Sequence, residues 1–153
     1  QLGHQALADG RWRIYVFADA ARPDAADSRL AALCTFLAEA PSSPVCSFTP
    51  AGVDDDAVFD VRAVLQQHHR DVEPGDVPAF LLPRKAPLGL IDYEKVFTAD
   101  ATNDIFAARG IDRELGAIVV VRPDQYVAHV LPLDAHAELA GFFVGIMRAP
   151  ALV

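Results

Sequence analysis

The chain has 153 residues, of which 52% are hydrophobic and 22% are charged. A domain of this size buries about 68–70% of the surface that its unfolded chain exposes, so this composition excludes extensive disorder and predicts one core. Twenty-one acidic residues against thirteen basic residues give a net charge of -8, which repels nucleic acid and anionic membranes. We therefore expect no nucleic-acid partner.

No apolar run approaches the length of about 20 residues that a transmembrane helix requires. The opening segment, QLGHQALADGRWR, also lacks the basic and then apolar order of a signal peptide. The sequence thus predicts a soluble, cytoplasmic protein with no membrane partner.

The first part of the chain is predicted to run from a strand into a helix. Residues 11–18 (RWRIYVFA) alternate large side chains after an Ala-Asp-Gly turn, as a strand does. Residues 27–39 place three leucines on one helical face, and Asp27 or Ser28 is the expected N-cap.

The chain has two cysteines, which are too few for a disulfide framework and too far apart in sequence for a C-x-x-C pair. Cys34 lies on the leucine stripe of the predicted helix, where a thiol acts as a small buried hydrophobe. Cys46 follows a proline-rich turn, and no neighbouring basic residue stabilises its thiolate.

Prolines and a glycine over residues 41–52 break the chain before the next predicted strand. The acidic triplet Asp54–Asp56 is interpreted as a solvated loop, since it is weak evidence for a metal site. Residues 58–65 (VFDVRAVL) alternate apolar with polar side chains and predict a strand. His68 and His69 end this strand in polar surface. They are not interpreted as a metal site, because adjacent histidines cannot easily share one metal.

Residues 72–92 carry four prolines and two glycines among apolar residues. This pattern predicts a long ordered arm rather than a regular element. The strings AFLLP and LGLI within it should lie against protein, for example on a neighbouring surface.

Residues 95–99 (KVFTA) predict a short strand, and residues 102–109 predict a short helix that Gly110 ends as a C-cap. A hairpin is then expected from residues 117–121 and 126–131. A last helix over residues 136–147 follows.

Asp134 is the expected N-cap of that last helix. The hairpin turn is explained by Pro123, which presets φ, and by Asp124, which can bond to the backbone two residues on. Turn geometry places less demand on the residue types at positions 122 and 126, so Arg122 and Tyr126 remain available for surface contacts.

The order of elements is the one that a thioredoxin-like fold requires: α/β, with a central mixed β-sheet flanked by helices and an antiparallel hairpin toward the C-terminal side. A thioredoxin needs a reactive cysteine where the first helix begins, because the helix dipole favours a thiolate there. The junction here, VFADAARPDAADS, has no cysteine. Thioredoxins also place a cis-proline beside their thiols, just before the hairpin strand. The corresponding segment here, GIDRELG, has no proline. The sequence predicts a redox-silent domain.

Several strings carry a family resemblance, namely ADGRWRIYVFA, FDVRAVL, LLPRKAPLGLIDYEKVFTAD and ARGIDRELGAIVVVRPDQYVAHVLPL. Together they resemble the C-terminal domain of flavin-dependent phenol 2-monooxygenases, in the 3-hydroxybenzoate hydroxylase branch. The resemblance implies a thioredoxin-like domain without redox cysteines, which supports dimer formation and packs against the catalytic domains. Residues 1–153 would then be one domain at the C-terminal end of a larger flavoprotein.

For that parent enzyme the resemblance implies FAD and NAD(P)H, and a homodimer whose catalytic domains contact this one. We expect this chain to bind no cofactor or metal itself and to hold no catalytic residue, since it lacks the G-x-G-x-x-G turn that holds FAD. The candidate interface residues are Arg122, Pro123, Asp124, Tyr126, Asp92 and Tyr93.

Two alternatives from other functional classes remain open. One is a stand-alone thiol oxidoreductase that uses Cys34 or Cys46, although neither has the expected partner or position. The other is a small-ligand binding module with Tyr93 or Trp12 in a pocket, although the sequence offers no convergent set of polar groups.

Overall fold

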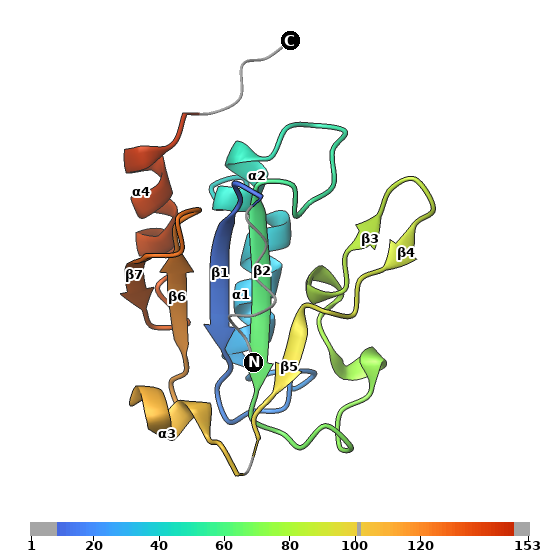
Figure 1. Ribbon diagram of the computed structural model, residues 1–153, viewed down its shortest axis with the longest axis vertical. Helices are drawn as coiled ribbons and strands as arrows, with labels where there is room; N and C mark the ends of the chain where they lie inside the picture. Colours follow the sequence, from blue (N-terminus) through green and yellow to red (C-terminus); the bar gives the residue numbers. More distant parts are fainter. Residues whose placement is uncertain (1–8, 101, 149–153) are drawn as a thin grey trace.

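The computed structural model describes residues 9–100 and 102–148 (Figure 1). Its centre is a five-stranded sheet in the order β5-β2-β1-β6-β7. The strands are β1 (Trp12–Phe17), β2 (Phe59–Leu65), β5 (Val96–Thr98), β6 (Ala117–Val121) and β7 (Val127–Leu131). β2 pairs in parallel with β1 and β5, whereas β6 pairs antiparallel with β1 and β7. This mixed sheet confirms the predicted thioredoxin-like fold.

Helices cover both faces of the sheet, because alternate residues of each buried strand point to opposite sides. Ile14 and Val16 of β1 pack with α1 (Arg29–Glu39), α2 (Pro44–Phe48) and α4 (His136–Ile146) in the main core. Tyr15 and Phe17 belong to a second, smaller core with Phe106, on α3 (Ile105–Arg109).

The predicted helix α1 is confirmed, and Ser28 is its N-cap, with Oγ accepting a hydrogen bond from the Ala31 amide at 3.2 Å. Its leucine stripe is buried together with Cys34, as the helical spacing indicates. β5 and α3 also form within the predicted ranges, although α3 begins at Ile105, three residues later than predicted, and Gly110 ends it in the left-handed conformation.

The helices differ from the predictions in two places, α2 and the start of α4. The proline-rich stretch after α1 contains α2, because Pro44 occupies the first turn, where no amide donor is required, and Ser43 caps it. Asp134 does not cap α4, so that prediction is wrong. The N-cap position is Ala135, and the Asp134 carboxylate lies 3.9 Å from an Arg29 guanidinium nitrogen.

The β6–β7 turn uses five residues, Arg122 to Tyr126. The Gln125 amide donates to the Arg122 carbonyl at 2.8 Å, and Gln125 itself has a φ of 69°. The pairing of β6 with β7 shifts register between Val120 and Val121, just before the turn, as at a β-bulge. β7 begins at Val127, one residue later than predicted.

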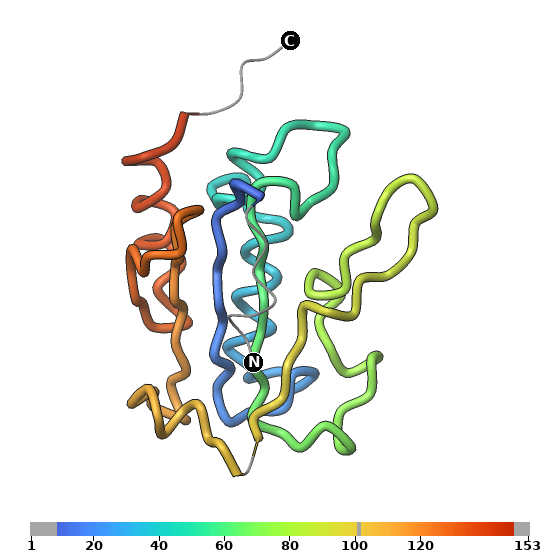
Figure 2. Tube along the Cα trace, viewed as in Figure 1, coloured from blue at the N-terminus to red at the C-terminus, as the bar shows by residue number. Residues whose placement is uncertain are grey.

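The segment over residues 72–92 is ordered, as predicted, but it contains short regular elements. It forms two 3₁₀ helices, η2 (Pro74–Asp76) and η3 (Ala79–Leu81), and a hairpin of β3 (Arg84–Lys85) and β4 (Leu90–Ile91). Leu81 is buried in the main core, so the first half lies against protein as expected. The β3–β4 hairpin instead projects away from the sheet (Figure 2).

In the described part of the chain, no helix is long and apolar enough to cross a membrane. The cytoplasmic location stays a prediction.

Candidate functional site

The amino end of α1 is where a thioredoxin places its reactive thiol, and here a carboxylate occupies it. Asp19 follows β1, is almost fully buried, and accepts hydrogen bonds from the Arg29 and Leu30 amides at 3.0 and 3.3 Å. These amides are the donors that would otherwise stabilise a thiolate or a phosphate. The Asp19 carboxyl group therefore already occupies the donors that either anion would need.

The two cysteines are free thiols that differ in burial. Burial raises the pKa of the Cys34 thiol to about 12. Cys46 is exposed, and its Sγ lies 3.4 Å from the Ala38 carbonyl oxygen. A thiolate is therefore strongly disfavoured at Cys34, as the sequence indicated.

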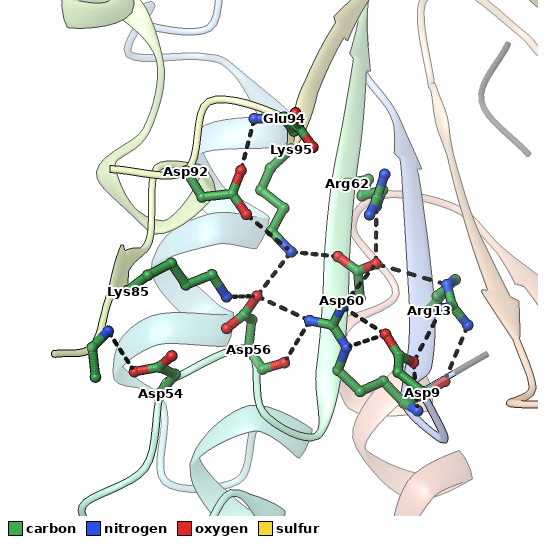
Figure 3. A network of polar contacts seen from close by, with 12 residues as sticks. Asp9, Arg13, Asp54, Asp56, Asp60, Arg62, Lys85, Asp92, Glu94 and Lys95 are labelled. Carbon is green, nitrogen blue, oxygen red and sulfur yellow. Dashed lines mark hydrogen bonds and ion pairs between the residues drawn. The ribbon is translucent and has the colours of Figure 1, made fainter. Parts of the chain in front are cut away.

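A cluster of ion pairs crosses β1, β2 and the chain segment before β5 (Figure 3). At its centre Asp60 of β2 is fully buried. The Asp60 carboxylate lies 2.6 Å from Lys95 Nζ, 2.9 Å from Arg62 Nε and 3.7 Å from Arg13 Nε. Parallel pairing sets Arg13 directly beside Asp60, so the sheet register brings these charges together. We name the whole group of nine charged residues the ionic cluster: Asp9, Arg11, Arg13, Asp56, Asp60, Arg62, Lys85, Asp92 and Lys95.

Asp56 extends the ionic cluster toward the arm, so the interpretation of Asp54–Asp56 as a solvated loop is wrong for this residue. Asp56 is buried, and its Oδ2 lies 2.8 Å from Lys95 Nζ and 3.1 Å from an Arg11 nitrogen. It also pairs with Lys85 of β3. The contact with Lys85 connects the loop before β2 to the base of the β3–β4 hairpin.

Electrostatics within the cluster favours the charged carboxylates. Burial alone would raise the pKa of Asp56, but hydrogen bonds from Lys85 and Lys95 outweigh this effect and lower it to about 2. In Asp60, burial is likewise outweighed by Lys95 and the nearby arginines, so the pKa falls below its ordinary value. Both carboxylates are held ionised by fixed cations, which is an arrangement for structure rather than for proton transfer.

Four of the predicted interface residues lie together in the β6–β7 turn. Arg122 and Asp124 form an exposed ion pair at 2.6 Å, with the half-buried Pro123 between them. The Asp124 carboxylate also lies 3.4 Å from the Tyr126 amide, which matches its predicted turn role. Tyr126 has an exposed side chain.

The other two predicted residues lie at the far edge of the sheet. Asp92 accepts from the Glu94 amide at 2.9 Å and lies 3.6 Å from Lys95 Nζ at the base of the arm. Tyr93 beside it is exposed. Because β5 and β7 are opposite edges, the six residues form two separate groups rather than one site (Figure 1).

Exposed apolar side chains gather on the same two sides of the molecule. On the arm, Leu88 and Leu90 are 78% and 65% exposed. On the opposite side, the end of the β6–β7 turn, β7 and α4 expose a longer series: Tyr126, Val127, Val130, Val144 and Ile146. We name the outer edge of β7 together with the outer side of α4 the β7–α4 surface. Surfaces of this kind mark sites where another protein packs.

The surface hollows give no support to the ligand-binding alternative. Two hollows of about 250 and 380 Å³ lie beside α1, and Ala38 and Phe80 line both. Trp12 lines neither, because its ring packs edge-on against Phe142 and Phe143 at centroid distances of 6.2 and 5.3 Å. Tyr93 lies outside both hollows as well.

Sequence reasoning missed Asp19 and the ionic cluster. The signal for the cluster was a charged residue at every second position in two strands. The first strand begins R-W-R, ahead of I-Y-V-F, and the second begins F-D-V-R. These charges share one face of adjacent strands, and recognising them requires knowing that the strands pair. No local pattern distinguishes Asp19 from the other acidic residues of its loop.

The family model for the phenol hydroxylase C-terminal dimerisation domain matches residues 1–151. The chain is 55% identical over 155 residues to a 3-hydroxybenzoate 4-monooxygenase of Comamonas testosteroni, covering 97% of this chain and 24% of that protein. It is 32% identical over 141 residues to the FAD-dependent monooxygenase terD of Aspergillus terreus, covering 89% of this chain and 23% of that protein. The chain thus spans about a quarter of the length of these relatives.

Proposed function

Because this chain belongs to the family of phenol hydroxylase C-terminal dimerisation domains, we propose that it joins two subunits of a larger aromatic hydroxylase without taking part in the chemistry. The match over almost the whole chain is the observation that carries this proposal. Residues 1–153 would be one domain of that enzyme, and its FAD and NAD(P)H would bind to the remainder of the parent chain. The relatives named above, one of them described as FAD-dependent, support this assignment.

A redox-silent role is supported by the amino end of α1. Asp19 occupies the amides that a catalytic thiolate would need, and the only thiol on α1, Cys34, is buried with a raised pKa. The same carboxylate would repel a pyrophosphate, which supports a domain that binds no FAD itself. The domain then contributes surface rather than reactive groups.

The first test is the native mass and visible spectrum of the full polypeptide that carries this chain. We expect a mass several times 16.5 kDa, the absorbance of bound flavin, and a dimer in analytical ultracentrifugation. A colourless polypeptide that remains monomeric at all concentrations would overturn the proposal.

Thiol alkylation tests the redox-silent part separately. Iodoacetamide should label Cys46 slowly at neutral pH, and Cys34 only after unfolding, because burial disfavours its thiolate. The variant Cys46→Ser is the matched control, since it should leave no thiol of this domain that is labelled before unfolding. Fast labelling of either cysteine below pH 7 would instead support the thiol oxidoreductase alternative.

A further inference from the structure

We propose that the second subunit packs against the β7–α4 surface, so that the outer edge of β7 and the outer side of α4 form the dimer contact. This inference rests on the proposed function and adds the location of the interface. The occupant is a second copy of this chain. Figure 1 shows β7 and α4 together along one side of the molecule, opposite the β3–β4 hairpin.

The edge of β7 is open to another strand. In the described part of the chain, only β6 pairs with β7, so the outward backbone groups of Val127–Leu131 lack a strand partner. Proteins usually protect such an edge with charges, proline or short length. β7 has five residues, none of which is Asp, Glu, Lys or Arg, and Val127 and Val130 are exposed. By register these two valines share the face of Val119 and Val121, which is opposite α4, so they border the open edge from that side while α4 borders it from the other. The other edge, β5, has only three residues and follows the charged Lys95.

The outer side of α4 is unusual for a helix that faces water. Gly141 and Gly145 lie one turn apart, and a Cβ at either position would meet nothing within 4 Å. Their lack of side chains is thus not required by packing within the described chain, although glycine lowers helix stability. Val144 is 67% exposed between them. Close approach of a second backbone explains both the glycines and the exposed valine.

The family description as a dimerisation domain favours a second copy as the occupant, and charge favours this side of the molecule. Each copy has a net charge of -8, so two copies repel unless they meet through a surface with few acidic groups. α4 contains one carboxylate, Glu138, which lies 3.3 Å from His129 Nε2 of β7. The arm has charged residues beside its apolar tip, among them Arg84, Lys85 and Asp92. Moreover, an antiparallel strand or helix pair can be two-fold symmetric, so one surface can serve both subunits.

The test measures the dimer dissociation constant of the full polypeptide by sedimentation. The double variant Gly141→Leu, Gly145→Leu blocks close approach, and it should not weaken α4, because leucine favours a helix more than glycine does and a Cβ at either position meets no atom of the described chain within 4 Å. A second variant, Val130→Lys, places a charge on the exposed β7 strand. We expect either variant to weaken association by about tenfold or more, as truncation or blocking of an interface centre does. Leu88→Lys on the arm is the control and should leave association unchanged.

The outcomes separate this inference from the proposed function. If the unaltered polypeptide is dimeric and both β7–α4 variants associate normally, the location is wrong while dimerisation stands. Dissociation by Leu88→Lys with no effect of the other two would place the contact on the arm instead. If the unaltered polypeptide is monomeric at every concentration, the proposed function itself fails.

Discussion

The two edges of the sheet are built from different interactions. At the β5 edge, buried charges of the ionic cluster hold β1, β2 and the base of the arm together. At the β7 edge, α4 is held by apolar contacts, and the outer surface carries little charge. The comparison indicates that one edge is closed by paired charges, whereas the other is left apolar and open.

The apolar side is expected to be most sensitive at Phe143. This residue is fully buried on α4 and packs edge-on against Phe59 and Trp12 at centroid distances of 4.9 and 5.3 Å. Phe143→Ala should lower the free energy of unfolding by about 3–5 kcal/mol, because it removes a buried ring and leaves a cavity. Urea denaturation measures the change, and Leu115→Ala at a partly exposed site is the control. A loss no larger than that of the control would mean that α4 is not anchored through this ring.

The charged side is expected to be nearly as sensitive at Asp60. Asp60→Ala should lower the free energy of unfolding by about 3 kcal/mol, because it leaves buried cations beside an apolar methyl group. Lys95 keeps Asp56 as a partner, which limits the loss. The control is Asp24→Ala, since the Arg22–Asp24 pair is half exposed and should contribute less than about 1 kcal/mol. Equal effects of the two variants would show that the ionic cluster contributes no more than a surface pair.

Acid should weaken the charged side through Asp56. The pKa of Asp56 is lowered from 3.8 to about 2, so its ion pairs stabilise the fold fully above 3.8 and are lost as pH falls toward 2. Asp56→Asn should therefore be less stable than the unaltered chain near neutral pH, and the difference should shrink between these two values. Denaturation across this pH range measures it. A difference that stays constant with pH would show that the Asp56 charge does not contribute.

Local patterns predicted most of the fold, whereas the charged side depended on pairing between distant segments. The leucine stripe of α1, the Gly110 cap and the β6–β7 hairpin each follow from residues within a few positions of one another. Asp56 and Asp60 meet Lys95 only because β2 pairs with β1 and β5, so their burial could not be read from neighbours in sequence. Pro44 was misinterpreted because proline both breaks a helix and favours its first turn.

The same limit applies to the candidate interface. The turn chemistry of Pro123 and Asp124 was predictable, and Asp124 contacts the backbone as expected. The unpaired edge of β7 and the empty space around Gly141 could not be predicted, because both depend on which elements the fold leaves without a neighbour. The candidate residues named from the sequence lie on both sides of the molecule, and which of them contact a partner stays a prediction.

The smallest expected effect concerns the turn that leads into β7. Gln125 has a φ of 69°, a conformation that glycine adopts without steric cost. Gln125→Gly should therefore raise the free energy of unfolding by about 0.5–1 kcal/mol, as thermal or urea denaturation would measure. Asp124→Gly in the same turn is the matched control and should lower stability, because its carboxylate pairs with Arg122 and its backbone has no positive φ. If both variants destabilise the domain, the Gln125 side chain has a stabilising role that outweighs its backbone conformation.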